Sequence, residues 1–331
     1  MKGIIVHGKK PAEDVFGPES VQRINRLIDL HPAPYGMEKF PEDAGILADA
    51  EVLFTVWGTP SLSEAFLDAC GKLKLVIHVG GSPKGVGTQE FFAKGLKLSS
   101  TYAANAVPVA EYTLSQILFC LKRGWDFALY IKREGHYPPR GKERIIGAYG
   151  GIVGLISLGM IGTHVCQLLK HHDVKVIAYD PFLPQEKAGE LNVELCSLDE
   201  VFAAADVVSL HTPLLAATTG MITGDHFRRM KPNASFINTS RGAVIREDEM
   251  VEVLKQREDI QAVLDVTSPE PPVKGSPLYS LPNVIVTPHI AGAFGNEPLR
   301  MGSYAADELE RYVTGAPLKW EITEKMIPYM A

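Results

Sequence analysis

Arg241, Glu270 and His289 have the side-chain types that acid–base chemistry on a small anion requires. Histidine suits proton transfer in both directions, because its ordinary pKa of about 6.5 lies close to neutral pH. A carboxylate on the far ring nitrogen fixes the tautomer and stabilises the imidazolium. A guanidinium fork binds a carboxylate or a polarised carbonyl while staying charged. The three residues therefore predict a proton donor, its acidic partner and an anion anchor.

Each of these residues also has an interpretation without chemistry. Arg241 could cap a strand end, Glu270 could be a solvated acid in a proline-rich loop, and His289 could be a hydrogen-bonded histidine of the core. All three, however, occur at the end of a predicted strand or in the loop that follows it, each in a separate motif. This joint placement favours the catalytic interpretation, which geometry must test.

The elements that must position these residues indicate an α/β fold. Short β-branched runs alternate with amphipathic helical stretches, which is typical of parallel strands joined by crossover helices. We expect two doubly wound parallel-sheet domains: a discontinuous one formed by residues 1–101 and 292–331, and a second formed by residues 102–291. The first has expected strands at 3–6, 51–56, 73–79 and 96–100 and helices near 20–30 and 61–70. The second has expected strands at 152–157, 174–179, 206–211, 234–239, 262–266 and 284–287.

Three further segments complete this organisation. A helix is expected from about 105 to 124, because its apolar residues recur at helical spacing. Another is expected from about 296 to 313, after which the tail returns to the first domain. Residues 125–149 are rich in aromatic and basic residues but poor in strand or core-helix signals. We interpret them as a surface arm that covers something, with a partner subunit as one candidate.

The turn SLGMIG (157–162) directly follows an apolar strand and opens a helix. In the G-x-G-x-x-G pattern the glycines allow a tight turn, close approach of the backbone to a pyrophosphate, and close packing of helix on strand. Ser157 replaces the first glycine, and it fits there if its backbone keeps a negative φ. The replacement weakens the motif without removing it. Strand, turn and helix together predict a Rossmann-type dinucleotide site, rather than glycines that only permit packing.

Asp180 closes the next predicted strand, near the separation of about 20 residues expected for the acid that binds the adenosine ribose. Its charge would repel a 2′-phosphate, and no arginine follows in Pro181 and Phe182. These residues favour NAD over NADP. The alternative is that Asp180 only caps a loop.

Several motifs together resemble the D-isomer-specific 2-hydroxyacid dehydrogenase family, and the resemblance covers nearly the whole chain. Arg, Glu and His occur in the order that the family shows. The resemblance implies two α/β domains with the active site in the cleft between them, NAD on one side and the substrate held from the other. Besides the glycine turn, the motifs are NAVPVAE (105–111), HTPL (211–214), NTSRG (238–242), DVTSPEP (265–271) and TPHIAG (287–292).

The resemblance implies hydride transfer between NAD(H) and a small 2-keto or D-2-hydroxy acid such as glyoxylate or hydroxypyruvate. His289 is then the acid and base, Glu270 its partner, and Arg241 the ligand of the substrate carboxylate and carbonyl. Trp57 either faces the cleft or packs in the core. Further substrate contacts are expected from Gly80, Gly81 and Ser82, in a loop whose sequence departs from the pattern of the family. Cofactor contacts are expected from Leu158, Gly159, Met160, Ile161, Gly162, Asp180, His211, Thr212, Pro213, Thr218, Thr239, Ser240, Arg241, Asp265 and His289.

Composition narrows the partners. The chain is 46% hydrophobic with a net charge of −6 and has no run of five or more like charges, so neither a nucleic acid nor a membrane surface is indicated. The apolar run at the N-terminus is too short for a signal peptide, and no apolar stretch reaches the ~20 residues of a membrane span. The four cysteines are far apart in the sequence and lack the spacing of a metal site or a redox dithiol. His171 and His172 are adjacent and lack further ligands, so no metal is expected. We expect a cytoplasmic homodimer.

The same residues bear on three other functions. An L-specific lactate or malate dehydrogenase would carry its glycine turn at the N-terminus, whereas here a whole α/β unit precedes it. A formate dehydrogenase needs no acid such as Glu270 beside its histidine. An NAD-sensing regulatory protein on the same fold, with little turnover, remains the alternative. The identity of the 2-keto acid stays open.

Overall fold

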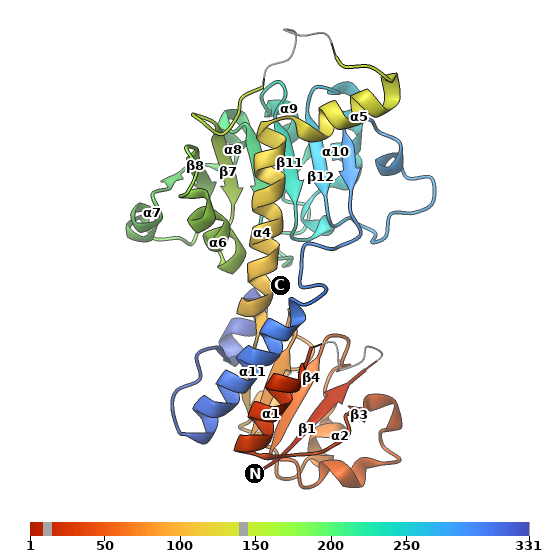
Figure 1. Cartoon of the computed structure of the whole chain (residues 1–331), viewed down its shortest axis with the longest axis vertical. Coiled ribbons are helices and arrows are strands. Elements are labelled where there is room, and N and C mark those ends of the chain that lie inside the picture. Colours follow the sequence, from red (N-terminus) through yellow and green to blue (C-terminus); the bar gives the residue numbers. More distant parts are fainter. Residues whose placement is uncertain (9–14, 139–144, 331) are drawn as a thin grey trace. The chain divides into compact units, whose positions relative to one another are not determined.

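The structure, a computed structural model, describes all residues except 9–14, 139–144 and 331. The chain divides into two compact units, Met1–Asn105 with Ala293–Ala331, and Ala106–Gly292. It passes from the first unit to the second inside helix α4 (Tyr102–Leu121). Each unit is built on one seven-stranded sheet (Figure 1). The α/β fold class with two parallel-sheet units is therefore confirmed.

The sheet of unit 1 has the strand order β14-β6-β5-β4-β1-β2, with β3 also paired to β1. All pairs are parallel except β14 with β6. The described strands are β1 (Lys2–His7), β2 (Asp29–Leu30), β3 (Tyr35–Gly36), β4 (Val52–Val56), β5 (Leu75–Val79), β6 (Lys97–Ser100) and β14 (Glu321–Ile322). The helices are α1 (Pro18–Leu27), α2 (Glu64–Ala69), α3 (Gln89–Ala93) and α11 (Pro298–Val313), with 3₁₀ turns at Met37–Lys39, Ala44–Leu47 and Glu324–Tyr329.

Alternation along the strands of unit 1 supplies two separate cores. Ile4 and Val6 of β1 pack with α2 and α3 on one face of the sheet, and Ile5 packs with α1 and α11 on the other. Because successive side chains of a strand point to opposite faces, a strand buried on both sides appears as a continuous apolar run. This explains why the short runs of the first hundred residues were recognisable as strands.

The sheet of unit 2 is entirely parallel, with the order β13-β12-β11-β10-β7-β8-β9. Its strands are β7 (Ile152–Ile156), β8 (Lys175–Tyr179), β9 (Glu194–Leu195), β10 (Val207–Leu210), β11 (Ser235–Asn238), β12 (Gln261–Leu264) and β13 (Val284–Val286). Its helices are α5 (Gly124–Glu134), α6 (Met160–Leu169), α7 (Gln185–Leu191), α8 (Leu198–Ala204), α9 (Gly224–Arg229) and α10 (Glu247–Gln256), with 3₁₀ turns at Gly242–Val244 and Pro277–Tyr279.

Helices cover both faces of this second sheet. Apolar residues of α4 and α6, such as Ile117 and Val165, pack on one face. Residues of α8, α9 and α10, such as Phe202, Phe227 and Leu254, pack on the other. Ser197 begins α8 with a capping box formed with Glu200, which satisfies two backbone donors at the helix start.

The expected arm at 125–149 contains a helix that the sequence patterns did not reveal. α5 has no buried residue, yet it is helical from Gly124 to Glu134. Arg123 precedes it with a φ of 52°, so a left-handed residue separates α4 from α5. Trp125 packs against the core of unit 2, but no residue of α5 is fully buried, so the helix lacks the buried apolar stripe by which a core helix is recognised in a sequence. Residues 139–144 of the arm lie outside the described residues.

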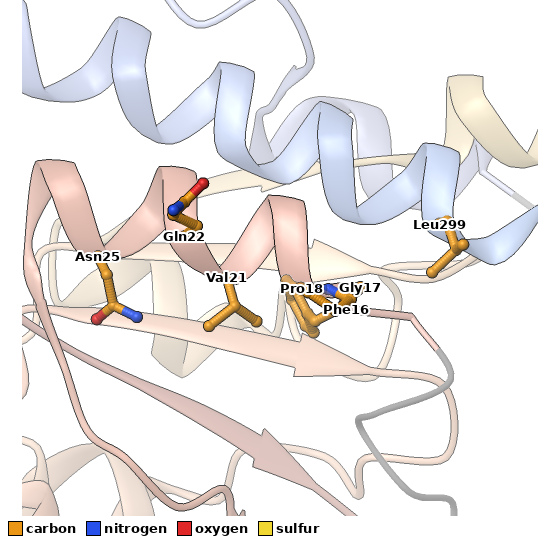
Figure 2. Close-up of a pocket in the computed structure, with 7 residues that line it drawn as sticks. All are labelled: Phe16, Gly17, Pro18, Val21, Gln22, Asn25 and Leu299. Atoms are coloured by element: carbon orange, nitrogen blue, oxygen red, sulfur yellow. The ribbon is translucent and has the colours of Figure 1, made fainter.

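A shallow groove lies beside α1 in unit 1 (Figure 2). None of its lining residues is titratable, and none was predicted to take part in chemistry. It is therefore not the site for which Arg241, Glu270 and His289 are candidates. Its lining residues are Phe16, Gly17, Pro18, Val21, Gln22, Asn25 and Leu299.

Candidate active site

The chain order of the second sheet reverses between β7 and β10, which lie side by side at its centre. In open parallel sheets ligands bind at such a point, beyond the carboxyl ends of the strands. The glycine turn follows β7, and the segment beginning at His211 follows β10. Ser157 and Thr212 join the two segments through a hydrogen bond of 2.8 Å between their hydroxyls. The predicted dinucleotide turn therefore lies where the topology places a ligand.

Ser157 has a φ of +74°, so the expectation of a negative φ at this residue was wrong. The turn keeps the left-handed backbone that a first glycine would adopt, although serine has a Cβ that disfavours it. The Ser157 side chain is held in this turn by its hydrogen bond with Thr212. The backbone conformation of the motif is thus retained where its first glycine is not.

The two glycines of the turn meet different requirements. A Cβ on Gly162 would lie 2.2 Å from the carbonyl oxygen of Ser157, so only glycine allows α6 to pack this closely on the turn. A Cβ on Gly159 would meet nothing within 4 Å, so the backbone at the start of α6 is open to a ligand. The N-terminus of a helix offers free N–H groups and a positive dipole end, which suit a pyrophosphate. These residues fit a dinucleotide.

Asp180 follows β8, and both of its carboxylate oxygens are already hydrogen-bonded. Oδ2 accepts from the backbone N of Leu158 at 2.7 Å, and Oδ1 accepts from the backbone N of Phe182 and Leu183 at 2.9 and 3.1 Å. Asp180 therefore does cap its loop, as the alternative interpretation held. A carboxylate oxygen can accept more than one hydrogen bond, and Oδ2 accepts only one from the described residues. A ribose hydroxyl can still be bound there.

The segment after β10 is held by its own side chains. His211 is buried, its Nε2 lies 3.0 Å from the Ser209 hydroxyl, and burial lowers its pKa to about 3. The Thr218 hydroxyl donates to the Pro213 carbonyl at 2.6 Å and accepts from the backbone of Leu215. These side chains hold the loop, which leaves backbone groups for any cofactor contact.

Arg241 follows β11 on a turn that Asn238 shapes. The Asn238 side chain accepts from the backbone N of Ser240 at 2.9 Å and donates to the Arg241 carbonyl at 3.1 Å. One guanidinium nitrogen of Arg241 donates to the Ser240 carbonyl at 2.7 Å. Burial lowers the pKa of Arg241, and the charge of Glu270 opposes that shift. Guanidinium pKa values are high enough that Arg241 keeps its charge.

Glu270 and His289 meet directly, as predicted. Glu270 Oε1 lies 2.5 Å from His289 Nδ1, and the two side chains are 41% and 49% exposed. The bond leaves Nε2 as the ring nitrogen that is available to a ligand. His289 has a φ of +55°, a left-handed conformation that few residues other than glycine adopt.

Asp265 lies beneath the segment that carries His289 and is 2% exposed. Its Oδ1 accepts from the Thr287 hydroxyl at 2.6 Å and from the backbone N of Ile290 at 2.9 Å, and its Oδ2 accepts from the backbone N of Ala291 at 2.9 Å. Its carbonyl accepts from the backbone N of His289. Asp265, predicted to contact the cofactor, therefore also shapes the histidine loop.

The predicted substrate loop lies in unit 1, after β5. A Cβ on Gly80 would lie 2.3 Å from Nε2 of His78, and one on Gly81 would lie 3.6 Å from the indole nitrogen of Trp57. Ser82 is exposed, and Trp57 is half-buried against the core. His78 is buried, its Nδ1 lies 2.9 Å from the Thr55 hydroxyl, and burial lowers its pKa to about 4.

Sequence reasoning missed four residues that hold these segments: Tyr112, Thr113, Asn238 and Thr287. Thr113 hydrogen-bonds Thr239 through their hydroxyls at 2.9 Å, and Tyr112 hydrogen-bonds Thr287 at 3.0 Å. Asn238 and Thr287 stand inside the motifs NTSRG and TPHIAG, which was the signal available. Tyr112 and Thr113 lie on α4, where helical spacing suggested packing alone.

A doubly wound parallel sheet with a glycine turn at its reversal point defines unit 2 as a dinucleotide-binding α/β unit. Residues 115–291 match the model of the D-isomer specific 2-hydroxyacid dehydrogenase, NAD binding domain. The chain belongs to this family, and unit 2 is its NAD-binding domain.

Relatives agree with this assignment. The hydroxypyruvate reductase of Thermotoga maritima is 30% identical over 294 residues, which are 87% of this chain and 93% of that protein. The D-3-phosphoglycerate dehydrogenase 2 of Arabidopsis thaliana is 32% identical over 91% of this chain but only 47% of its own length. This chain spans about half the length of the phosphoglycerate dehydrogenases that it matches.

A solved relative shows the same fold. The D-isomer specific 2-hydroxyacid dehydrogenase of Lactobacillus delbrueckii, in its NAD complexed form, superimposes with a TM-score of 0.81 at 21% identity. The comparison covers 97% of this chain and 100% of that chain. The fold inferred from the strand and helix patterns is therefore that of a known dehydrogenase.

Proposed function

We propose that this protein is an NAD-dependent dehydrogenase that interconverts a small 2-keto acid and the D-2-hydroxy acid. The observation that carries the proposal is the 2.5 Å contact between Glu270 and His289, in the same unit as Arg241 and the dinucleotide turn. An acid–histidine pair beside a charged guanidinium supplies proton transfer and anion binding together. A protein that only bound NAD would need neither.

The pair assigns the role of each ring nitrogen. Glu270 on Nδ1 keeps a proton on that nitrogen, so Nε2 gives a proton to the carbonyl oxygen during reduction and takes one back during oxidation. Arg241 binds the carboxylate and polarises the adjacent carbonyl, with donors that remain beyond its bond to Ser240. The turn at 157–162 and Asp180 would hold NADH, which would supply the hydride. Backbone N–H groups of Gly80, Gly81 and Ser82 are proposed as further carboxylate ligands.

The substrate class is proposed to be small acids such as glyoxylate or hydroxypyruvate. A relative named hydroxypyruvate reductase is covered over 93% of its length, whereas the phosphoglycerate dehydrogenases are covered over only about half of theirs. Phosphoglycerate and longer keto acids remain to be separated by experiment.

The test is a panel of 2-keto acids, with NADH oxidation followed by its absorbance. We expect turnover of at least one small keto acid, and a loss of most of kcat in both directions on His289→Ala. Arg241→Lys should mainly raise KM, because a point charge cannot replace the bidentate fork. NAD binding without turnover of any member of the panel would favour a regulatory protein instead.

We also propose a homodimer in the cytoplasm. α5 exposes or half-exposes all of its residues, including Phe127, and so can bury apolar side chains against a second copy. The cysteines of the described chain are free, which suits a reducing compartment. Among the described residues, none of the helices combines the length and the apolar composition of a transmembrane segment. Light scattering that shows a monomer at micromolar concentration would contradict the dimer.

A further inference from the structure

Helix α4 carries a hydroxyl group that reaches the histidine loop through another hydroxyl. The Tyr112 hydroxyl lies 3.0 Å from Thr287 Oγ1, and Thr287 Oγ1 lies 2.6 Å from Asp265 Oδ1. Thr287 Oγ1 donates to Asp265 Oδ1, which uses its single hydroxyl hydrogen. Tyr112 must then donate to Thr287. The hydrogen bonds run in one direction, from Tyr112 through Thr287 to Asp265.

Asp265, at the end of this chain of hydrogen bonds, also binds the backbone around His289. Its two oxygens accept from the backbone N of Ile290 and of Ala291, and its carbonyl accepts from the backbone N of His289. Thr287 adds its own carbonyl, 3.0 Å from the same His289 nitrogen. Thr287, Ile290 and Ala291 are therefore tied to one buried carboxylate, and His289 is tied to the backbone carbonyl of the same residue.

This segment needs such support, because His289 is held at a φ of +55°. A left-handed residue with a side chain persists only where its surroundings impose the conformation. The half-exposed ring has a single hydrogen-bond partner among the described residues, Glu270. Its direction depends on the backbone beneath it, so a looser backbone would weaken the contact with Glu270.

We propose that Tyr112 and Thr287 are positioning residues for His289, acting through Asp265. This inference rests on the proposed function, because it assigns to the two residues the alignment of the proton donor. Neither side chain is hydrogen-bonded to the ring, whose partner among the described residues is Glu270. Their substitution should therefore lower kcat while leaving KM for NADH unchanged.

The experiment compares Thr287→Val, which removes the hydroxyl at nearly constant volume, with Thr287→Ser, which keeps it. Tyr112→Phe removes the donor at the other end, and Ser115→Ala removes a hydroxyl of α4 that bonds only within its own helix region. We expect kcat to fall roughly three- to tenfold in Thr287→Val and Tyr112→Phe. Thr287→Ser and Ser115→Ala should keep the wild-type value.

A second measurement does not depend on turnover. Nitrogen NMR of labelled histidine, assigned by comparison with His289→Ala, reports which ring nitrogen of His289 carries the proton. We expect wild type to hold it on Nδ1, and Thr287→Val and Tyr112→Phe to hold it there less. Unchanged tautomer populations in both variants would overturn the proposal. An inactive wild type that still shows the expected change would count against the proposed function alone.

Discussion

The backbone of Gly242 packs directly against Thr267, so that a Cβ at position 242 would lie 2.1 Å from the Thr267 carbonyl carbon. Gly242 follows Arg241, and Thr267 lies in the loop that leads from β12 to Glu270. The close approach joins the turn of the anion ligand to the loop of the acid. Ser268 extends the link, because its backbone N donates to Glu247 Oε2 at 2.8 Å, close beyond the same turn.

Gly242→Ala should therefore separate Arg241 from Glu270. The added methyl meets backbone atoms that cannot rotate away, so we expect a stability loss of about 1–3 kcal/mol. We also expect kcat/KM for the keto acid to fall by about 100-fold, the cost of a displacement of about 1 Å. Gly189→Ala in α7, where a Cβ meets nothing within 4 Å, is the control. Equal activity of the two variants would show that the contact does not position the site.

The protein should be more stable with glycine at position 157 than with alanine. Both changes remove the hydrogen bond to Thr212, but only glycine also relieves the left-handed backbone. We expect the free energy of unfolding, measured with urea, to be about 1 kcal/mol higher for Ser157→Gly than for Ser157→Ala. Thr212→Val removes the same hydrogen bond by changing its other partner, and so measures the contribution of that bond alone. The reverse order of stability would mean that the φ at 157 carries no strain.

Asp180 should make NADH the preferred cofactor. Its carboxylate accepts three backbone hydrogen bonds and would repel a 2′-phosphate. We expect kcat/KM to favour NADH over NADPH by roughly tenfold or more, and Asp180→Asn, which removes the charge, to narrow that ratio. A protein that prefers NADPH would refute this assignment of Asp180.

The two directions of the reaction should depend on pH in opposite ways. Reduction needs a protonated His289 and oxidation needs the neutral ring, so reduction should fade as pH rises. Glu270 places a carboxylate oxygen 2.5 Å from His289 Nδ1, and we predict that Glu270→Gln, which removes the negative charge, moves the fall of reductive kcat/KM to lower pH. The dissociation constant of NADH is the control and should stay nearly constant. If the pH profiles of reductive kcat/KM coincide for wild type and Glu270→Gln, Glu270 is a solvated loop acid without influence on His289.

His78 should make the native protein less stable in mild acid. Burial lowers its pKa to about 4 from the ordinary 6.5, so the unfolded chain takes up a proton that the native chain does not. The contribution of the neutral His78 ring to the free energy of unfolding is fully present above pH 6.5. It is lost as pH falls toward 4, by at most about 1.4 kcal/mol per pH unit. His78→Gln should flatten this dependence in urea unfolding at pH 7 and pH 5. Exposed His171→Gln serves as the control, and an equal slope in both variants would be evidence against the buried neutral ring.

Much of the fold could be inferred from the chain. Apolar β-branched runs identified the main strands of both sheets, and the turn at 157–162 placed the dinucleotide site after the right strand. The sequence patterns did not predict the two-residue strands or α5, because these elements are too short or too exposed to show a periodic pattern of apolar residues. The meeting of Glu270 and His289 was also foreseen, since each lies in a distinctive motif near a strand end.

The sequence by itself determined which residue types stand at the ends of the strands, because motifs and strand patterns are local properties of the chain. Only the tertiary structure decided how those residues are held. The left-handed backbone of Ser157 and of His289, the bond from Tyr112 to Thr287 and the contact of Gly242 with Thr267 all depend on neighbours that are distant in sequence. Hydrogen-bond geometry and steric contact arise only when those segments are packed together, so no local pattern could encode them.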